Sequence, residues 1–157
     1  MTIGRRHLTA ISLMLILLSG CDAKRVFEQN MALQDAEWNY LEKPTFEAEI
    51  KDTQALYNLH VNFRYEAEYP YNNIFFLLNT FGPDSSASSE RVECVLFDNY
   101  GLPKGKGLGD MFFVQYKIRS KMRFAKPGQY HFVLEQNMRT DHLKGVHDVG
   151  LRLEKAD

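Results

Sequence analysis

The side chain with the clearest chemistry in this 157-residue sequence is the thiol of Cys21. Arg5 and Arg6 precede an almost continuous apolar stretch over residues 8–18, and two small residues then lead directly to Cys21. A basic start, an apolar run and a small-residue cleavage site are typical of a secretory signal. With the cysteine in register, the pattern predicts export, transfer of lipid to the Cys21 thiol and cleavage before it. The alternatives are a chance cysteine after an ordinary signal peptide, or a short membrane anchor, although a spanning helix needs about 20 apolar residues.

Lipid on Cys21 would decide where the protein resides. A single acyl chain holds a protein to a membrane only weakly, whereas two or more chains, such as palmitate, anchor it stably. We therefore expect a signal peptide over residues 1–20, a lipidated tether over residues 21–37 and a folded domain over residues 38–157. The predicted location is therefore an envelope membrane.

The mature chain is weakly acidic. Cleavage removes Arg5 and Arg6 and no acidic residue, so 17 of the 19 Lys and Arg residues remain against 20 Asp and Glu, a formal charge of −3. This balance argues against nucleic acid as a partner, because nucleic acid favours a basic domain. Lipidation of Cys21 leaves Cys94 alone, which excludes an intrachain disulfide. Cys94 lies in an apolar stretch, so we interpret it as a small buried hydrophobe and not as a nucleophile.

Other residues that could take part in catalysis or ligand binding lack the neighbouring motif residues that such a site requires. The glycine-rich segment 105–109 has no Ser or Thr after its lysine, so it does not match a phosphate-binding loop and predicts an irregular loop with positive φ angles. Residues 141–142 and 147–148 pair Asp with His twice, but without the spacing of a known metal site, and favour a solvated hairpin. His60 and His131 are predicted on polar strand faces. We predict no catalytic residue, metal or cofactor.

The elements that position these residues are strands, because apolar and polar residues alternate with a period of two. Residues 57–65 alternate at all nine positions, and residues 46–51, 112–118, 130–138 and 149–153 follow the same pattern. Residues 74–81 and 91–98 are apolar on both faces, which is typical of central strands. Polar or glycine-rich turns separate the strands. The sequence predicts an all-β fold, an antiparallel, jelly-roll-like β-sandwich of seven to eight strands. A closed barrel is the alternative.

Two loops are candidates for contact with a partner. Tyr69 and Tyr71 flank a proline close to acidic residues, and aromatic side chains with polar neighbours bind both sugars and proteins. The competing interpretation is that these tyrosines are packed anchors of the loop. In the glycine-rich loop, Lys106 and Asp110 are the charged candidates for partner binding.

The order and spacing of several segments resemble one family over essentially the whole chain. The matching segments are Cys21, Phe27-Glu28, Trp38, Lys43–Phe46, Tyr57–Leu59, Tyr69–Asn73, Val92–Leu96, Gly105–Asp110, Pro127–Tyr130, Glu135–Arg139 and Gly145–Lys155. The chain resembles the gliding-motility lipoprotein GldH family of the Bacteroidota. The resemblance implies a lipoprotein needed for gliding in motile members and associated with the type IX secretion apparatus. It supplies no catalytic residues, and adds only the lipidated cysteine as a site.

The function we expect is therefore a non-enzymatic component of the gliding motility and type IX secretion machinery. With this function, the expected location is the outer membrane, on its periplasmic or its surface face. Its partners would be the membrane, through lipid on Cys21, and envelope proteins of that apparatus. Two alternatives stay open. One is a carbohydrate-binding envelope lipoprotein, because many β-sandwiches bind glycans, although fold alone is weak warrant. The other, which we favour least, is a lipid-anchored hydrolase.

Overall fold

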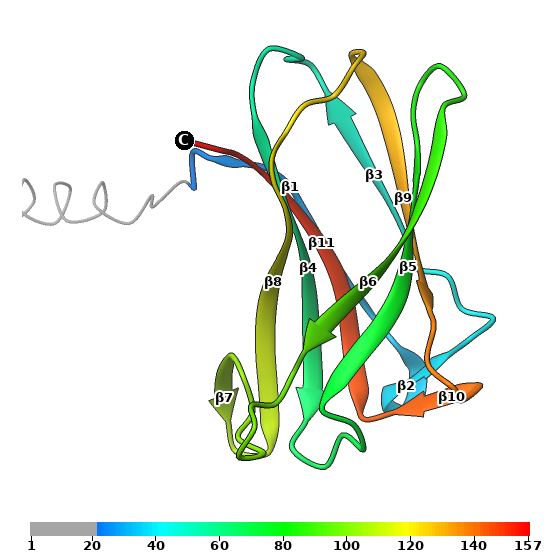
Figure 1. The fold of residues 1–157 in the computed structure, drawn as a ribbon, viewed down its shortest axis with the longest axis vertical. Helices are drawn as coiled ribbons and strands as arrows, with labels where there is room; N and C mark the ends of the chain where they lie inside the picture. Colours follow the sequence, from blue (N-terminus) through cyan, green and yellow to red (C-terminus); the bar gives the residue numbers. More distant parts are fainter. Residues whose placement is uncertain (1–21) are drawn as a thin grey trace, which may run out of the picture.

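The protein is described by a computed structural model that covers residues 22–157, and these residues form two antiparallel sheets packed face to face (Figure 1). Eight strands have six residues or more: β1 (Arg25–Ala32), β3 (Thr45–Ile50), β4 (Tyr57–Glu66), β5 (Asn73–Phe81), β6 (Ala87–Val95), β8 (Met111–Met122), β9 (Gly128–Gln136) and β11 (Val146–Lys155). The shorter elements are η2 (Gln34–Ala36), β2 (Glu37–Asn39), β7 (Lys106–Leu108) and β10 (His142–Lys144). Cys21 and the predicted signal peptide lie outside the described residues.

The long strands pair in a nested order. β1 pairs with β11, β3 with β9, β4 with β8, and β5 with β6, all antiparallel. One sheet has the order β1-β11-β4-β8-β7 and the other β3-β9-β5-β6, with β10 and β2 forming a separate two-stranded ribbon. Successive nested pairs in alternate sheets give jelly-roll connectivity. The predicted all-β, jelly-roll-like sandwich is confirmed, and neither sheet closes into a barrel.

The core lies between the sheets and follows from the period of two. On β4, the side chains of Leu59, Val61 and Phe63 point inward and are at most 1% exposed. Phe63 meets Phe76 of the opposite sheet edge to face, with ring centroids 5.8 Å apart. Aromatic rings bury a large area each and prefer such tilted contacts, so the aromatic residues of the alternating strands supply much of the contact between the sheets.

Two of our predictions about individual segments are wrong. We expected residues 21–37 to be a tether before the domain, but β1 is hydrogen-bonded to β11 along its length, with Phe27 opposite Leu153 and Met31 opposite Val149. The alternation is weak there because Gln29, at an inward position, lies at an exposed sheet edge. We also expected residues 91–98 to form a central strand, but β6 is the edge of the four-stranded sheet.

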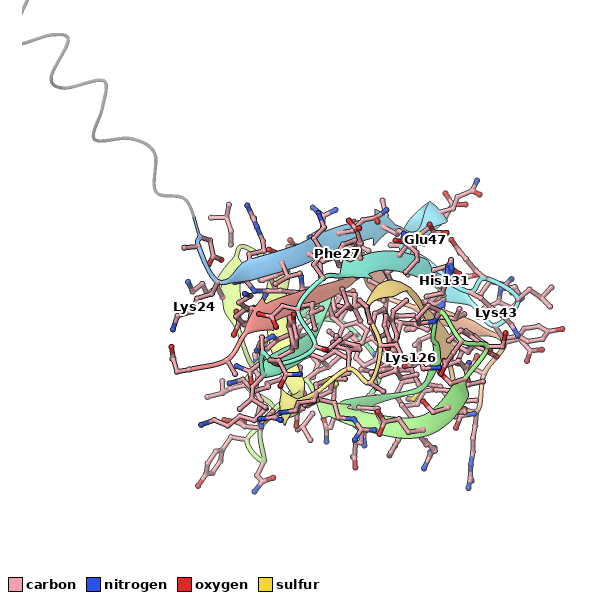
Figure 2. All side chains as sticks on the ribbon, turned by 90° about the horizontal axis from the view of Figure 1, so that it is seen from above. Lys24, Phe27, Lys43, Glu47, Lys126 and His131 are labelled. Atoms are coloured by element: carbon pink, nitrogen blue, oxygen red, sulfur yellow. The ribbon has the colours of Figure 1, made fainter. Side chains whose placement is uncertain are left out.

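The chain termini of the described domain lie together at one end. The backbone N–H of Lys155 donates to Lys24 O at 2.8 Å, and the ammonium of Lys24 pairs with Asp157. Figure 1 shows this end at the top, while the loop between β4 and β5 and the hairpin of β7 and β8 lie at the bottom. Figure 2, viewed from above, shows Lys24 at the edge where β1 begins. The two candidate loops are therefore remote from the start of the domain.

Candidate functional site

The two candidate loops meet at the end of the sandwich away from the termini (Figure 1). We call residues 66–73 and 96–110 together the loop end. The backbone N–H of Ala67 donates to the carbonyl oxygen of Asp110 at 2.7 Å, and the N–H groups of Leu96 and Phe97 both donate to Asn72 O. The structure thus joins residues that are 24 to 43 positions apart in the sequence into one continuous surface.

A buried tyrosine fixes the glycine-rich side of the loop end. The Tyr65 hydroxyl lies 2.7 Å from Leu96 O and 2.6 Å from Lys104 O, so that it holds both ends of the segment between them. Burial raises the pKa of Tyr65 to about 12. The hydroxyl therefore stays protonated at neutral pH and remains a hydrogen-bond donor.

Tyr69 is part of the interior and not of the exposed surface. Its side chain is 5% exposed, its hydroxyl donates to Asn73 O at 2.9 Å, and its ring stacks on Phe97. Burial raises the pKa of Tyr69 well above its usual range. The structure supports the packed-anchor interpretation for Tyr69 and leaves Tyr71, which is 40% exposed and meets Tyr69 edge to face, as the accessible aromatic ring.

The glycine-rich loop presents an exposed hairpin. Lys106 and Asp110 are exposed and flank Leu108, whose side chain is 89% exposed. Gly105 has a φ of +101°, and a Cβ at this residue would lie 2.2 Å from Phe113 O, so only glycine fits. The predicted positive φ angles are confirmed at Gly105 and Gly109. The residues between them form the short strand β7 and not the irregular loop that we expected.

The acid and histidine residues that the sequence singled out do not converge. His147 Nε2 lies 2.7 Å from Glu66 Oε1, whereas His142 pairs with Glu37 and Asp148 with Arg64. Within residues 22–157, no group of three His, Cys, Asp or Glu side chains could hold a metal ion.

Cys94, by contrast, behaves as the sequence indicates. Its side chain is fully buried, and burial raises the pKa of its thiol to about 12. Since the thiolate is the reactive form, this cysteine is inert at neutral pH.

The two remaining histidines differ from each other. His131 lies beside Glu47 on the outward face of the four-stranded sheet, at 3.4 Å (Figure 2). We predicted a surface position for His60 as well, but its side chain is buried at 5% exposure, and its Nδ1 is an unpartnered buried atom. Burial lowers the pKa of His60, since the protonated ring would lose hydration. Strand register places the long side chains of Arg152 and Lys117 on either side of His60, and the sequence alone does not reveal these neighbours.

The sequence did not predict a second polar surface, on the outward face of the five-stranded sheet. There, Arg152 donates to Glu28 at 2.8 Å, to Glu154 at 2.9 Å and to Asp22 at 2.5 Å. Asn62, which also faces outward, is only 1% exposed. Polar residues at alternate positions of β4 and a glycine within β11 were the available signals, but they do not reveal which strands are neighbours.

Fold and site together define a jelly-roll domain with a rigid, exposed loop surface far from its termini. Comparison with known proteins narrows this class. The family model described as GldH lipoprotein matches residues 25–153. The chain belongs to the GldH lipoprotein family.

Two curated proteins are similar over nearly their whole length. The gliding motility lipoprotein GldH homolog of Christiangramia forsetii is 29% identical over 150 residues, covering 91% of each chain. The gliding motility lipoprotein GldH of Flavobacterium johnsoniae is 30% identical over 149 residues, covering 90% of this chain and 92% of the relative. No solved structure matches the chain.

The family consists of lipoproteins, which are held at an envelope membrane by lipid. In the part of the chain that the structure describes, no helix is long and apolar enough to cross a bilayer.

Proposed function

We propose that this protein is an outer-membrane lipoprotein, acylated on Cys21, that serves as a non-enzymatic component of the gliding motility and type IX secretion machinery. The observation that carries the proposal is its similarity, over about nine-tenths of the chain, to two proteins named for gliding motility. The function of the domain in that machinery is to bind other envelope proteins.

The position of the termini supports anchoring at one end of the domain. Asp22, which follows Cys21 directly, is held by Arg152 at 2.5 Å, and Asp22 O accepts a hydrogen bond from the backbone N–H of Arg25 at 3.1 Å. An extended residue spans about 3.5 Å, so the lipid on Cys21 would lie within a few ångströms of the folded domain. The terminal end would then face the membrane.

The loop end would in turn point away from the membrane, which is where a partner of the machinery can reach it. Its exposed side chains include Tyr71, Lys106, Leu108 and Asp110, together with Tyr100 at 90% exposure. Aromatic and apolar side chains at the centre of a contact, with charges at its rim, are typical of protein interfaces. The non-enzymatic part of the proposal rests on the separation of the histidines and on the inert thiol of Cys94.

The anchor is tested by replacing the chromosomal gene with one encoding Cys21→Ser. We expect loss of labelled fatty acid from the protein, its release from the outer-membrane fraction, and reduced colony spreading and secretion in a motile host. A Cys94→Ala strain, which introduces no polar group into the core, is the matched control and should retain lipid, location and spreading. Retention of Cys21→Ser in the outer membrane, or normal spreading and secretion in a strain without the gene, would contradict the proposal.

The contact surface is tested by site-specific photocrosslinking in living cells. A photoreactive residue at Leu108 or Tyr71 should capture an envelope protein of the gliding or secretion apparatus, because both side chains are exposed at the loop end. The same residue at Glu47, on the outward face of the four-stranded sheet, is the control. Equal capture from Glu47 and from the loop end would argue against this surface.

A further inference from the structure

The outward face of the five-stranded sheet carries an uncharged row of polar groups across four strands. Strand register places Asn30 of β1 opposite Gly150 of β11, Gly150 opposite Asn62 of β4, and Asn62 opposite Gln115 of β8. We call these four residues the amide row. The Glu28 carboxylate reaches the row from β1 and is paired there with Arg152.

Hydrogen bonds hold the amide row in one arrangement. Asn62 Nδ2 donates to Asn30 Oδ1 at 3.0 Å and to Glu28 Oε1 at 3.1 Å, while Gln115 Nε2 donates to Asn62 Oδ1 at 3.1 Å. Buried polar networks whose members are paired rigidify a site. The amides therefore need no rearrangement before a ligand binds.

Gly150 is necessary for this arrangement. A Cβ at this residue would lie 1.8 Å from Asn30 Oδ1 and 2.8 Å from Gln29 O. The missing side chain lets the Asn30 amide lie across β11 and reach Asn62. Glycine within a strand weakens it and often marks the close approach of a ligand or another backbone.

Beside the amide row lies a hollow of about 320 Å³. Its lining adds Arg64, Asp148 and Phe113 to Asn30 and Asn62. Arg64 is paired with Asp148, so the hollow holds no net charge, and the Phe113 ring is 38% exposed. Cavities that bind small molecules begin at about 300 Å³.

A second hollow of about 320 Å³ shares Arg64 and Phe113 with the first and continues to Lys106, Leu108 and Met111. The two form one groove that crosses β4 and β8 and runs toward the β7 edge. A ligand that fills it must be extended, with polar groups along one part and an apolar face along the other.

We propose that this groove binds a neutral oligosaccharide. Sugar hydroxyls donate and accept hydrogen bonds, as amides do, and no side-chain hydrogen bond within residues 22–157 engages Asn30 Nδ2 or Gln115 Oε1. The C–H face of a sugar ring stacks on an exposed aromatic ring such as Phe113. The internal Arg64–Asp148 pair leaves no free charge for an anion in the first hollow. This inference does not depend on the proposed function.

The test is binding of the full-length lipoprotein, in a detergent without a sugar headgroup, to an array of neutral and acidic hexose and N-acetylhexosamine oligosaccharides. We expect binding to neutral chains. The best-binding array oligosaccharide is then titrated against variants. Phe113→Ala and Gln115→Ala, both at exposed residues, should each weaken binding about threefold to tenfold through lost stacking and a lost hydrogen bond. Phe75→Ala, an outward aromatic residue of the four-stranded sheet, is the matched control and should bind as the unmodified protein does.

Three results would overturn the proposal. They are no binding to any array oligosaccharide, binding that prefers acidic chains, and binding that Phe113→Ala and Gln115→Ala leave unchanged. A fourth result would assign the groove to protein. It is binding of an extended peptide in the groove that none of the array oligosaccharides displaces. Near-ultraviolet circular dichroism confirms that each variant keeps its tertiary packing.

Discussion

The outward face of each sheet consists of alternate strand residues, but the polar side chains on the two faces are packed differently. On the five-stranded sheet, side chains from several strands bind Arg152 and Asn62. The side chain of Arg152 is 12% exposed, and Asn62 is 1% exposed. On the four-stranded sheet, polar groups pair singly in water, as in the 3.4 Å contact of His131 with Glu47, or cover apolar side chains, as Arg91 does over Phe75 at 3.9 Å.

The comparison teaches that neighbours, and not residue type, decide what an outward polar side chain contributes. An exposed ion pair gains little because water competes for both partners and screens the charge. Where neighbouring side chains exclude water from a polar group, water no longer competes for its hydrogen bonds. Removing one partner then leaves the other partners unsatisfied. Substitutions on the five-stranded face should therefore be costly, and equivalent substitutions on the four-stranded face should not.

The largest effect is expected for Arg152→Met, which keeps the length of the side chain and removes its charge. Glu28, Glu154 and Asp22 would then lose their shared cation, with only the exposed Arg25 left at 3.5 Å from Glu28. We expect a loss of about 2–4 kcal/mol in the free energy of unfolding. Urea unfolding, followed by fluorescence of the buried Trp38, measures it. Arg91→Met on the other face should cost no more than about 1 kcal/mol. Equal losses from the two variants would remove the distinction between the faces.

The next effect is expected for Asn62→Ala, which removes the centre of the amide row. Gln115, Asn30 and Glu28 lose a shared partner, so we expect a loss of about 1–3 kcal/mol in unfolding free energy. Asn79→Ala is the control, because Asn79 makes one hydrogen bond of 2.7 Å to Glu135 on the other face. A cost for Asn79→Ala as large as that for Asn62→Ala would show that burial does not separate them.

A smaller effect concerns the pH dependence of stability and the buried His60. Because burial lowers the pKa of His60, the unfolded chain binds a proton more readily than the folded one. The contribution of the neutral His60 ring to stability is therefore complete above pH 6.5, the ordinary pKa of histidine. It is lost as the pH falls below that value. Between pH 7 and pH 5, His60→Gln should lose less stability than the unmodified protein in urea titrations. Parallel curves for the two proteins would contradict the assignment.

The smallest effect is expected for Glu47→Gln. Its carboxylate is 58% exposed and lies 3.4 Å from the half-exposed ring of His131. We expect a change below about 0.5 kcal/mol in unfolding free energy, measured by the same urea titration. A loss of more than about 1 kcal/mol would mean that exposed pairs on this face do contribute to stability.

Much of the candidate site could be located from the sequence, but the function of its side chains could not. Proline, glycine and tyrosine marked the loops that form the loop end. That Tyr69 is buried while Tyr71 is exposed depends on Phe97, which comes from another segment. The amide row was missed because Asn30 and Gly150 are 120 residues apart in the sequence and neighbours in the sheet.

The sequence by itself determined the strand character of the chain, its inward face and its family. Alternation over residues 57–65 decides which side chains are apolar and therefore buried, because the strand period is two. Only the tertiary structure decided that β1 pairs with β11 and that Asn62, His60 and Arg152 share one desolvated surface. The physical reason is that hydrogen bonds between strands, and the burial they bring, depend on partners that local patterns do not encode.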